Sequence, residues 1–272
     1  MDPDRNGVFP CDFRGSRFLA VSFQGASVMK PQANFGGVRF LVPGAMLLAA
    51  NAGFINAVGL GFFHSPVSHM SGAVSHLGLD VARTAWGDAR ATLLIIVGFL
   101  LGAVASGILI GASRLVPGRH YGTALMAEGG LLAFSTWLLA TGSPWALPLA
   151  SMALGLQNAM ASSYCGFLIR TTHVTGTVTD IGVMIGHWIR HRAVDRWKLG
   201  FLFAVFGAFA VGGWFGALGD RRFGPMVLAL PAGLTTLAGM VYWFAFHRGL
   251  VDLLADPNPV LPATSSFPNR PR

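Results

Sequence analysis

Residues 68–78 read SHMSGAVSHLG, and residues 172–182 read THVTGTVTDIG. Each stretch follows an apolar segment that contains a second echo, GFINA at residues 53–57 and GLQNA at residues 155–159. The offset is 102 residues at the asparagine of the echo and 104 residues at the first histidine of the motif, so a two-residue insertion separates the copies. The pattern indicates an internal duplication, and its polar residues mark where function is expected to lie.

The chain has the composition of a protein that crosses a membrane several times. Of its 272 residues, 53% are hydrophobic and only 11% are charged, whereas about a quarter are charged in soluble domains. Six apolar runs reach the roughly 20 residues that a bilayer core requires. Five of them contain no Asp, Glu, Lys or Arg, and the sixth carries only Glu128. The runs are residues 40–63, 91–113, 121–140, 146–169, 199–218 and 223–246.

The positive charge of the chain is distributed as an orientation signal. The formal net charge is +8, but the basic residues lie between the apolar runs and do not form one face, so nucleic acid is not an expected partner. Cys11 and Cys165 lie in a predicted tail and a predicted span, with no metal-type spacing, and are expected to be free thiols.

The sequence predicts an all-α polytopic membrane helical bundle. It consists of two sequence-related halves, residues 38–142 and 143–248, which together supply six long spans and two short polar segments. Residues 1–37 are expected to be a disordered extension or the product of a mis-assigned start, since Met29 offers a second start. Residues 249–272 are expected to be a Pro-rich cytoplasmic tail.

The short polar segments leave the topology open between two arrangements. Pro66 to Leu79 comprises 14 residues, about 21 Å of helix against a hydrocarbon core of about 30 Å. If both segments cross the membrane, the chain has eight spans and parallel halves; if both are re-entrant, it has six spans and inverted halves. Either arrangement keeps the basic cluster at residues 190–198 and both termini in the cytoplasm.

The polar residues of the motifs are the candidates for a substrate or ion pathway. Ionisable groups at membrane depth are costly unless they face a cavity or a partner. Asp180 is the sharpest single candidate because Thr175 and Thr179 are close enough in sequence to donate hydrogen bonds to it. The alternative is that these side chains bond to one another and fix how the halves pack. The candidate residues are Asp180, His69, His173, His76, Asn56, Asn158, Thr175, Thr179, Ser71 and Ser75.

Three further sets of residues carry structural expectations. Asn56 and Asn158 are each expected to dock onto the motif of their own half, because an amide in hydrocarbon needs a partner. Glu128 is expected to be an interfacial acid near Arg119 or His120 rather than a buried proton carrier. Small-residue spacings predict helix contacts; they are Gly98 with Gly102, Gly107 with Gly111, and Gly212 with Gly216.

Signatures of catalysis were sought and not found in the sequence. It contains no P-loop, no HExxH motif and no nucleophile elbow. A metal site formed by His69, His76, His173 and Asp180 is conceivable only if the two polar segments meet, and nothing in the spacing reinforces it. We therefore expect no enzyme, no metal and no cofactor.

The two motifs resemble those of the YoaK family of bacterial integral membrane proteins, a domain of unknown function (1275). The resemblance is carried by GFINAVGL from Gly53, SHMSGAVSHLGLDVA from Ser68, GLQNA from Gly155 and THVTGTVTDIGVMIG from Thr172, and it extends over about residues 40–247. The first family motif more often reads MTGN, where this chain has Ser and Ala around the glycine. The resemblance implies a bacterial inner-membrane location and no established activity.

The leading functional hypothesis is a small secondary transporter or permease for an unknown small solute or ion. Its site is expected where the two polar segments meet near the midplane of the bilayer. The rival is a non-transporting membrane scaffold or partner-binding subunit, in which the motifs only hold the halves together. The substrate, the coupling ion and the oligomeric state cannot be read from the sequence.

Overall fold

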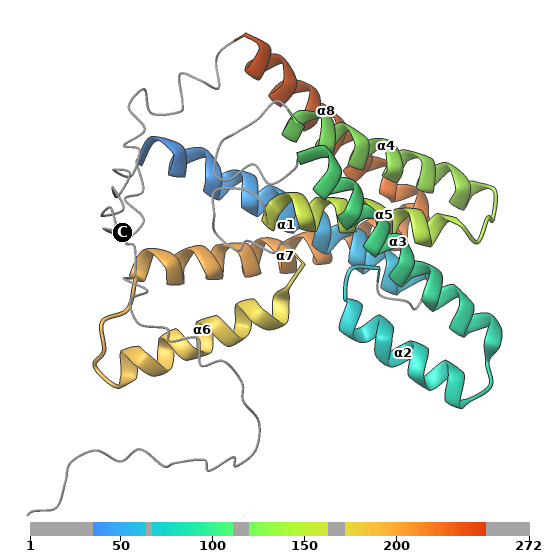
Figure 1. Cartoon of the computed structure of the whole chain (residues 1–272), viewed down its shortest axis with the longest axis horizontal. Helices are drawn as coiled ribbons and strands as arrows, with labels where there is room; N and C mark the ends of the chain where they lie inside the picture. The colour runs from blue at the N-terminus through green and yellow to red at the C-terminus, as the bar shows by residue number, and fades with distance from the viewer. Residues whose placement is uncertain (1–34, 64–66, 111–119, 163–171, 249–272) are drawn as a thin grey trace, which may run out of the picture. The chain divides into compact units, whose positions relative to one another are not determined.

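The computed structural model describes residues 35–63, 67–110, 120–162 and 172–248, and the regular elements in these ranges are all helices (Figure 1). The predicted all-helical class is therefore confirmed for this part of the chain. The predicted tails fall almost wholly outside it, at residues 1–34 and 249–272. The elements are α1 (Phe35–Phe63), α2 (Met70–Ala82), α3 (Trp86–Ile110), α4 (His120–Ala140), α5 (Ala146–Ser162), α6 (Val174–Ile189), α7 (Arg196–Phe223), the 3₁₀ helix η1 (Gly224–Leu228) and α8 (Ala229–His247).

Each of the six predicted apolar runs corresponds to a long helix, and the two polar segments form α2 and α6. Four described segments are long and apolar enough to cross a membrane; they are Val42–Gly61, Trp86–Ile110, His120–Ala140 and Arg196–His247, the last of which joins α7, η1 and α8. The helix α5 has 17 described residues, and the end of its predicted run, residues 163–169, lies outside the described ranges. These apolar helices indicate a membrane protein.

Glycines on α7 bring it into close contact with α1. A Cβ added at Gly212 would collide with the backbone of Ala50, and one added at Gly216 would collide with the backbone of Phe54. The predicted helix-contact role of this glycine pair is confirmed. Because residues later in α1 contact residues later in α7, the two helices are parallel.

The helices α3 and α5 form a second parallel pair of the same kind. A Cβ added at Gly98 would meet the backbone of Pro148, and one added at Gly102 would meet the backbone of Met152. This predicted contact is also confirmed. The prediction is wrong for Gly107, where an added Cβ would meet no atom within 4 Å; the glycine four residues later lies outside the described ranges.

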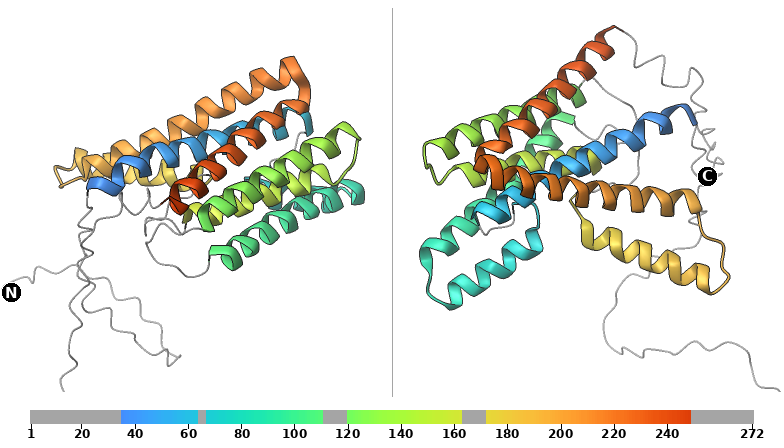
Figure 2. Two further views of the ribbon diagram at one scale, coloured as in Figure 1. Left: turned by 90° about the horizontal axis from the view of Figure 1, so that it is seen from above. Right: turned by 180° about the vertical axis from the view of Figure 1, so that it is seen from behind.

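The helices α4 and α8 pack side by side in opposite directions (Figure 2). Gly122 near the start of α4 contacts Gly239 in α8, whereas Gly129, about two turns later, contacts the earlier residue Ala232. The short α4–α5 connection makes α5 antiparallel to α4. The contacts of α1 with α4 and α5 complete the pattern, so α1, α4 and α7 run one way and α3, α5 and α8 run the other.

The short helices α2 and α6 each lie along one long helix of the bundle (Figure 1). α2 has 13 residues and packs against α3, and α6 has 16 residues and packs against α7. The N-terminal end of α2 lies beside α1, since Ser68 just before it bonds to Asn56. Near the C-terminal end of α2, the Asp80 carboxylate accepts a hydrogen bond of 3.2 Å from the Thr92 hydroxyl, which lies near the start of α3. α2 is therefore antiparallel to α3.

The main hydrophobic core lies where α1, α4, α5 and α8 meet. Its fully buried side chains include Ile55 and Val58 from α1, Leu132 from α4 and Leu154 from α5, each with at most 1% of its surface exposed. Such side chains occupy a packed interior in which polar groups need partners. The polar residues buried in this interior are therefore the ones to account for.

Candidate functional site

Each echo asparagine, Asn56 and Asn158, binds the start of the motif that follows it in the chain. The Asn56 Oδ1 atom accepts hydrogen bonds from the Ser68 hydroxyl at 3.0 Å and from the Ser68 backbone N–H at 3.4 Å. The Asn158 Oδ1 atom accepts one from the Thr172 hydroxyl at 3.1 Å. The predicted docking of each asparagine onto its own half is confirmed. The same contact thus occurs at both copies of the motif.

The structure does not bring the two polar segments together as predicted. α2 packs against α3 and α6 packs against α7, and no residue of α2 contacts a residue of α6. The expected site at a meeting of α2 and α6 is therefore wrong. The physical reason is that each short helix follows the long helix after it in the chain, and those two long helices pair with different partners.

The motif histidines and acid lie apart from one another. His69 is half-buried, and its ring meets the edge of the Phe209 ring of α7 at 6.0 Å. His76, His173 and Asp180 are exposed on the surface of the chain. Among the residues that the structure describes, no group of three His, Cys, Asp or Glu side chains is arranged to hold a metal ion.

Two of the four candidate hydroxyl residues, Ser75 and Thr179, donate hydrogen bonds within their own helix. The Ser75 hydroxyl donates to the Ser71 carbonyl at 3.0 Å, and the Thr179 hydroxyl donates to the Thr175 carbonyl at 2.9 Å. Thr179, one of two possible donors to Asp180, instead donates to the local backbone carbonyl, as is common for Ser and Thr in helices. All four hydroxyl residues are exposed.

A different set of polar side chains meets inside the bundle. The Asn51 amide of α1 lies 3.2 Å from Glu128 Oε1 of α4, 3.4 Å from Gln157 Oε1 of α5 and 3.2 Å from Thr235 Oγ1 of α8. We call these four residues the four-helix cluster. Glu128 and Gln157 have no exposed surface, and Thr235 is 5% exposed. The cluster therefore joins four helices through polar side chains at the core.

The burial of Glu128 corrects the expectation of an interfacial acid. Its side chain is directed into the bundle between α1, α5 and α8, where Asn51 binds it, and it does not reach solvent near the start of α4. Its second carboxyl oxygen, Oε2, is buried and has no hydrogen-bond partner. A carboxylate in this position is costly unless it is paired or carries a proton, and such an acid within a membrane bundle marks a candidate functional site.

One oxygen in the four-helix cluster, Glu128 Oε2, has no donor among the described residues. The Asn51 amide has two hydrogens but faces three acceptor oxygens. The Thr235 hydroxyl donates its one hydrogen to the Pro231 carbonyl at 2.6 Å, and the Gln157 amide donates to the Leu48 carbonyl at 2.8 Å. A proton on Glu128 would supply an additional donor at this point.

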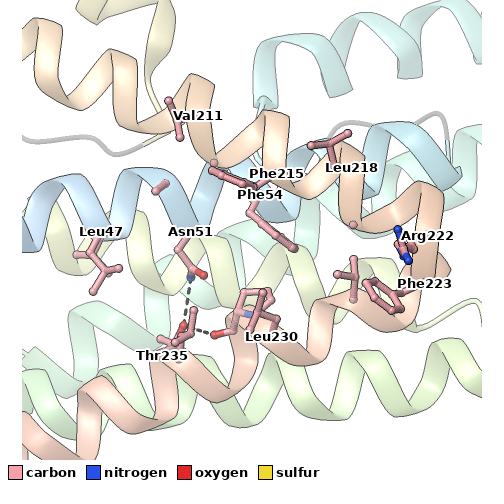
Figure 3. A pocket seen from close by; sticks show the side chains of 17 residues that line it. Leu47, Asn51, Phe54, Val211, Phe215, Leu218, Arg222, Phe223, Leu230 and Thr235 are labelled. Atoms are coloured by element: carbon pink, nitrogen blue, oxygen red, sulfur yellow. Dashed lines mark hydrogen bonds between the residues drawn. The ribbon is translucent and has the colours of Figure 1, made fainter.

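A groove of about 610 Å³ opens between α1, α7 and α8, and two cluster residues line it. Asn51 and Thr235 lie toward one end of this α1–α7–α8 groove, and Arg222 and Phe223 lie at the other (Figure 3). Its remaining walls are apolar, with Phe54, Phe215 and Leu230 among the lining residues. The volume falls in the range of small-molecule sites. Asn51 thus connects the groove, which it lines, to the buried acid, to which it donates a hydrogen bond.

The sequence reasoning missed Asn51 and Thr235 because it followed the duplication. The positions 102 residues after Asn51 and 104 residues before Thr235 are Ala153 and Leu131, so neither residue has a polar counterpart. A search for any amide or acid inside an apolar run would have found Asn51 and ranked Glu128 higher.

Comparison with known proteins gives one match. Residues 44–241, which are 198 of the 272 residues, match the sequence model of a family described as a protein of unknown function (DUF1275). No curated protein and no solved structure matches the chain.

Proposed function

Because the chain belongs to the DUF1275 family, whose function is unknown, we propose from its geometry that it is a small secondary transporter or permease. The observation that carries the proposal is Glu128, an acid with no exposed surface that is bonded to an amide of another helix. Buried acids in membrane bundles are typical of proton relays and ion sites. The four-helix cluster is then the binding site, and the α1–α7–α8 groove is its entrance.

We infer that the chain has six spans and two halves of opposite orientation. Under the offset of 102 to 104 residues, the pair α1 with α7 corresponds to the pair α5 with α3, and both pairs are parallel. The corresponding helices α4 and α8 are antiparallel. A pseudo-two-fold axis in the membrane plane accounts for both facts. Eight spans with parallel halves would require α4 and α8 to run the same way.

In this topology α2 and α6 are re-entrant half-helices. Ser68, just before α2, bonds to Asn56 seven residues before the end of α1, so the chain has turned back before α2 begins. The 13 residues of α2 then cover about 20 Å, too little for a core of about 30 Å. The site consequently lies near the midplane, beside the first helix of each half.

We place the protein in a bacterial inner membrane with both termini in the cytoplasm. An even number of spans puts the two ends on the same side. The basic cluster Arg190, Arg192, Arg196 and Lys198 between α6 and α7 supports assigning that side to the cytoplasm. Arg221 and Arg222, at the opposite end of α7, are then on the outer side.

We propose transport rather than catalysis because of the kind of groups that meet in the cluster. Two amides, one hydroxyl and one carboxyl from four helices can bind a solute and exchange a proton. Binding of a solute hydroxyl or amide would supply the donor that Glu128 Oε2 lacks. A proton and a solute would thereby compete for, or share, the same carboxyl group.

The second candidate function, a membrane scaffold, is favoured by a different observation. α2 and α6 each have one neighbouring helix and expose Ser71, Ser75, Thr175 and Asp180 on their free faces. Polar faces of this kind at membrane depth are expected to be covered by a partner. In that case the motifs hold an assembly together and carry no solute.

The test of transport uses proteoliposomes that contain the full chain and enclose a pH-sensitive dye. Acetate, laurate, alanine, Na⁺ and K⁺ are added outside in turn. We expect at least one solute to move protons in a protein-dependent manner, and we expect Glu128→Gln to abolish this movement while folded yield is retained. The matched control is Asp88→Asn, which alters an exposed acid in the first turn of α3. Proton movement in Glu128→Gln equal to that of the unaltered chain would contradict the proposal.

A further inference from the structure

The α1–α7–α8 groove has a single charged group in its lining. The side chain of Arg222 stands at one end, and no Asp or Glu is among the lining residues. The other polar side chains are Asn51 and Thr235, which already bond to each other at 3.2 Å. The lining therefore offers a long apolar surface with one positive charge.

Arg222 has no acidic partner among the residues that the structure describes. Asp220, two residues earlier, is directed toward α1, where a Cβ added at Gly61 would lie 2.9 Å from its Oδ2 atom. Asp220 is not among the residues that line the groove. Arg222 is exposed at the C-terminal end of α7, so its guanidinium is free to bind an anion.

The dimensions of the groove match one extended chain. Gly212, which contacts Ala50 next to Asn51, is ten residues before Arg222 along α7, a rise of about 15 Å. In the proposed topology this distance joins the outer interface to the middle of the bilayer. The volume of about 610 Å³ lies within the range of sites for small molecules.

We infer that the α1–α7–α8 groove binds a single-chain amphipathic carboxylate, with the carboxylate on Arg222 and the chain directed toward Asn51. The charge selects an anion, and the apolar walls select a hydrocarbon body. As a substrate assignment this inference rests on the proposed transport function. The binding itself does not, because it needs only the groove and Arg222.

The experiment measures equilibrium binding of radiolabelled laurate to the full chain in phosphatidylcholine nanodiscs. We expect saturable binding that Arg222→Gln weakens about tenfold, the factor that corresponds to one charged hydrogen bond. The matched control is Arg221→Gln, which removes the neighbouring arginine on the same helix, outside the groove lining, and should change the affinity less than twofold. Leu230→Trp should abolish binding by filling the groove, and dodecyltrimethylammonium should not compete.

Several outcomes would overturn the inference. They are an absence of saturable binding, equal weakening by both arginine variants, and equal competition by the cationic detergent. A bilayer phospholipid would be identified as the occupant by a different result. Replacing phosphatidylcholine by phosphatidylglycerol would then abolish laurate binding to the unaltered chain and leave the binding to Arg222→Gln unchanged. Laurate binding without laurate uptake would contradict the transport function alone. Uptake of another solute without laurate binding would contradict the groove ligand alone.

Discussion

The repeated motifs and the four-helix cluster differ in where they put their polar groups. The motif residues of α2 and α6, such as Ser75, His76 and Asp180, are exposed on the surface of the chain. Glu128 and Gln157 of the cluster have no exposed surface. The buried acid therefore lies outside the repeated motifs, at a position where the other half has Ala232.

The same comparison separates symmetric contacts from asymmetric ones. The bonds from Ser68 to Asn56 and from Thr172 to Asn158 occur at matching positions of the two halves. No cluster residue has a polar counterpart: the offset positions for Glu128 and Gln157 are Ala232 and Ile55. In the proposed transporter, the binding site would therefore be formed by residues that have no polar counterpart in the other half.

The largest effect on folding is expected when the donor of the four-helix cluster is removed. Asn51→Leu removes the amide that bonds Glu128 and Thr235; a buried group left unpaired costs about 1–3 kcal/mol, and more if it is charged, as Glu128 can be. We expect the free energy of unfolding to fall by about 2–4 kcal/mol, measured by titration with a denaturing detergent in mixed micelles.

The double variant Asn51→Leu with Glu128→Leu is the control for that prediction. Replacing both partners by apolar groups removes the unpaired acid, so the double variant should regain most of the lost stability. Losses that simply add would mean that Asn51 and Glu128 do not interact in the folded protein. The four-helix cluster would then not be a set of buried side chains that bond to one another.

An intermediate effect is expected at the two echo asparagines. Asn56 is 4% exposed and accepts two hydrogen bonds from Ser68, so Asn56→Ala should lower the free energy of unfolding by about 1–3 kcal/mol. Asn158 is half-buried, and its bond to Thr172 should be worth about 0.5–1.5 kcal/mol in the same titration. A larger loss at Asn158 than at Asn56 would reverse the expected order of the halves.

Much of the fold could be predicted from the sequence because its signals are local. Apolar runs of spanning length became helices, and the glycine pair Gly98 with Gly102 became a close contact between α3 and α5. The bond from Ser68 to Asn56 was also predictable, because an amide in an apolar helix needs a partner and the nearest one in sequence is the motif that follows.

The site was harder to predict because it depends on which helices become neighbours. Asn51 and Thr235 are 184 residues apart, and nothing in either local sequence specifies that α1 and α8 meet. Glu128 lies only eight residues after the start of α4, a depth that by itself is consistent with an interfacial acid. The direction in which that acid faces was fixed by the packing of α4 against α5 and α8.

The smallest effect on stability is expected on the free face of α6. Asp180 is exposed and lies on a helix that packs against α7 alone, so Asp180→Asn should change the free energy of unfolding by no more than about 0.5 kcal/mol. The exposed acid variant Asp88→Asn is the reference for a residue with no expected role. This prediction tests whether the motif residues are exposed in the membrane, because it assumes that nothing covers the free face of α6.

A loss well above that limit in membranes, but not in dilute detergent, would mean that a partner covers Asp180 in the bilayer. It would favour the scaffold function. A substitution that destabilises the protein only where a partner is bound identifies an interface residue. The proteoliposome assay then shows whether the motifs, the four-helix cluster or both contribute to proton movement. If Asp180→Asn stops proton movement while its stability is unchanged, the motif as well as the four-helix cluster belongs to the pathway. If only Glu128→Gln stops it, the duplicated motifs support a site that they do not form.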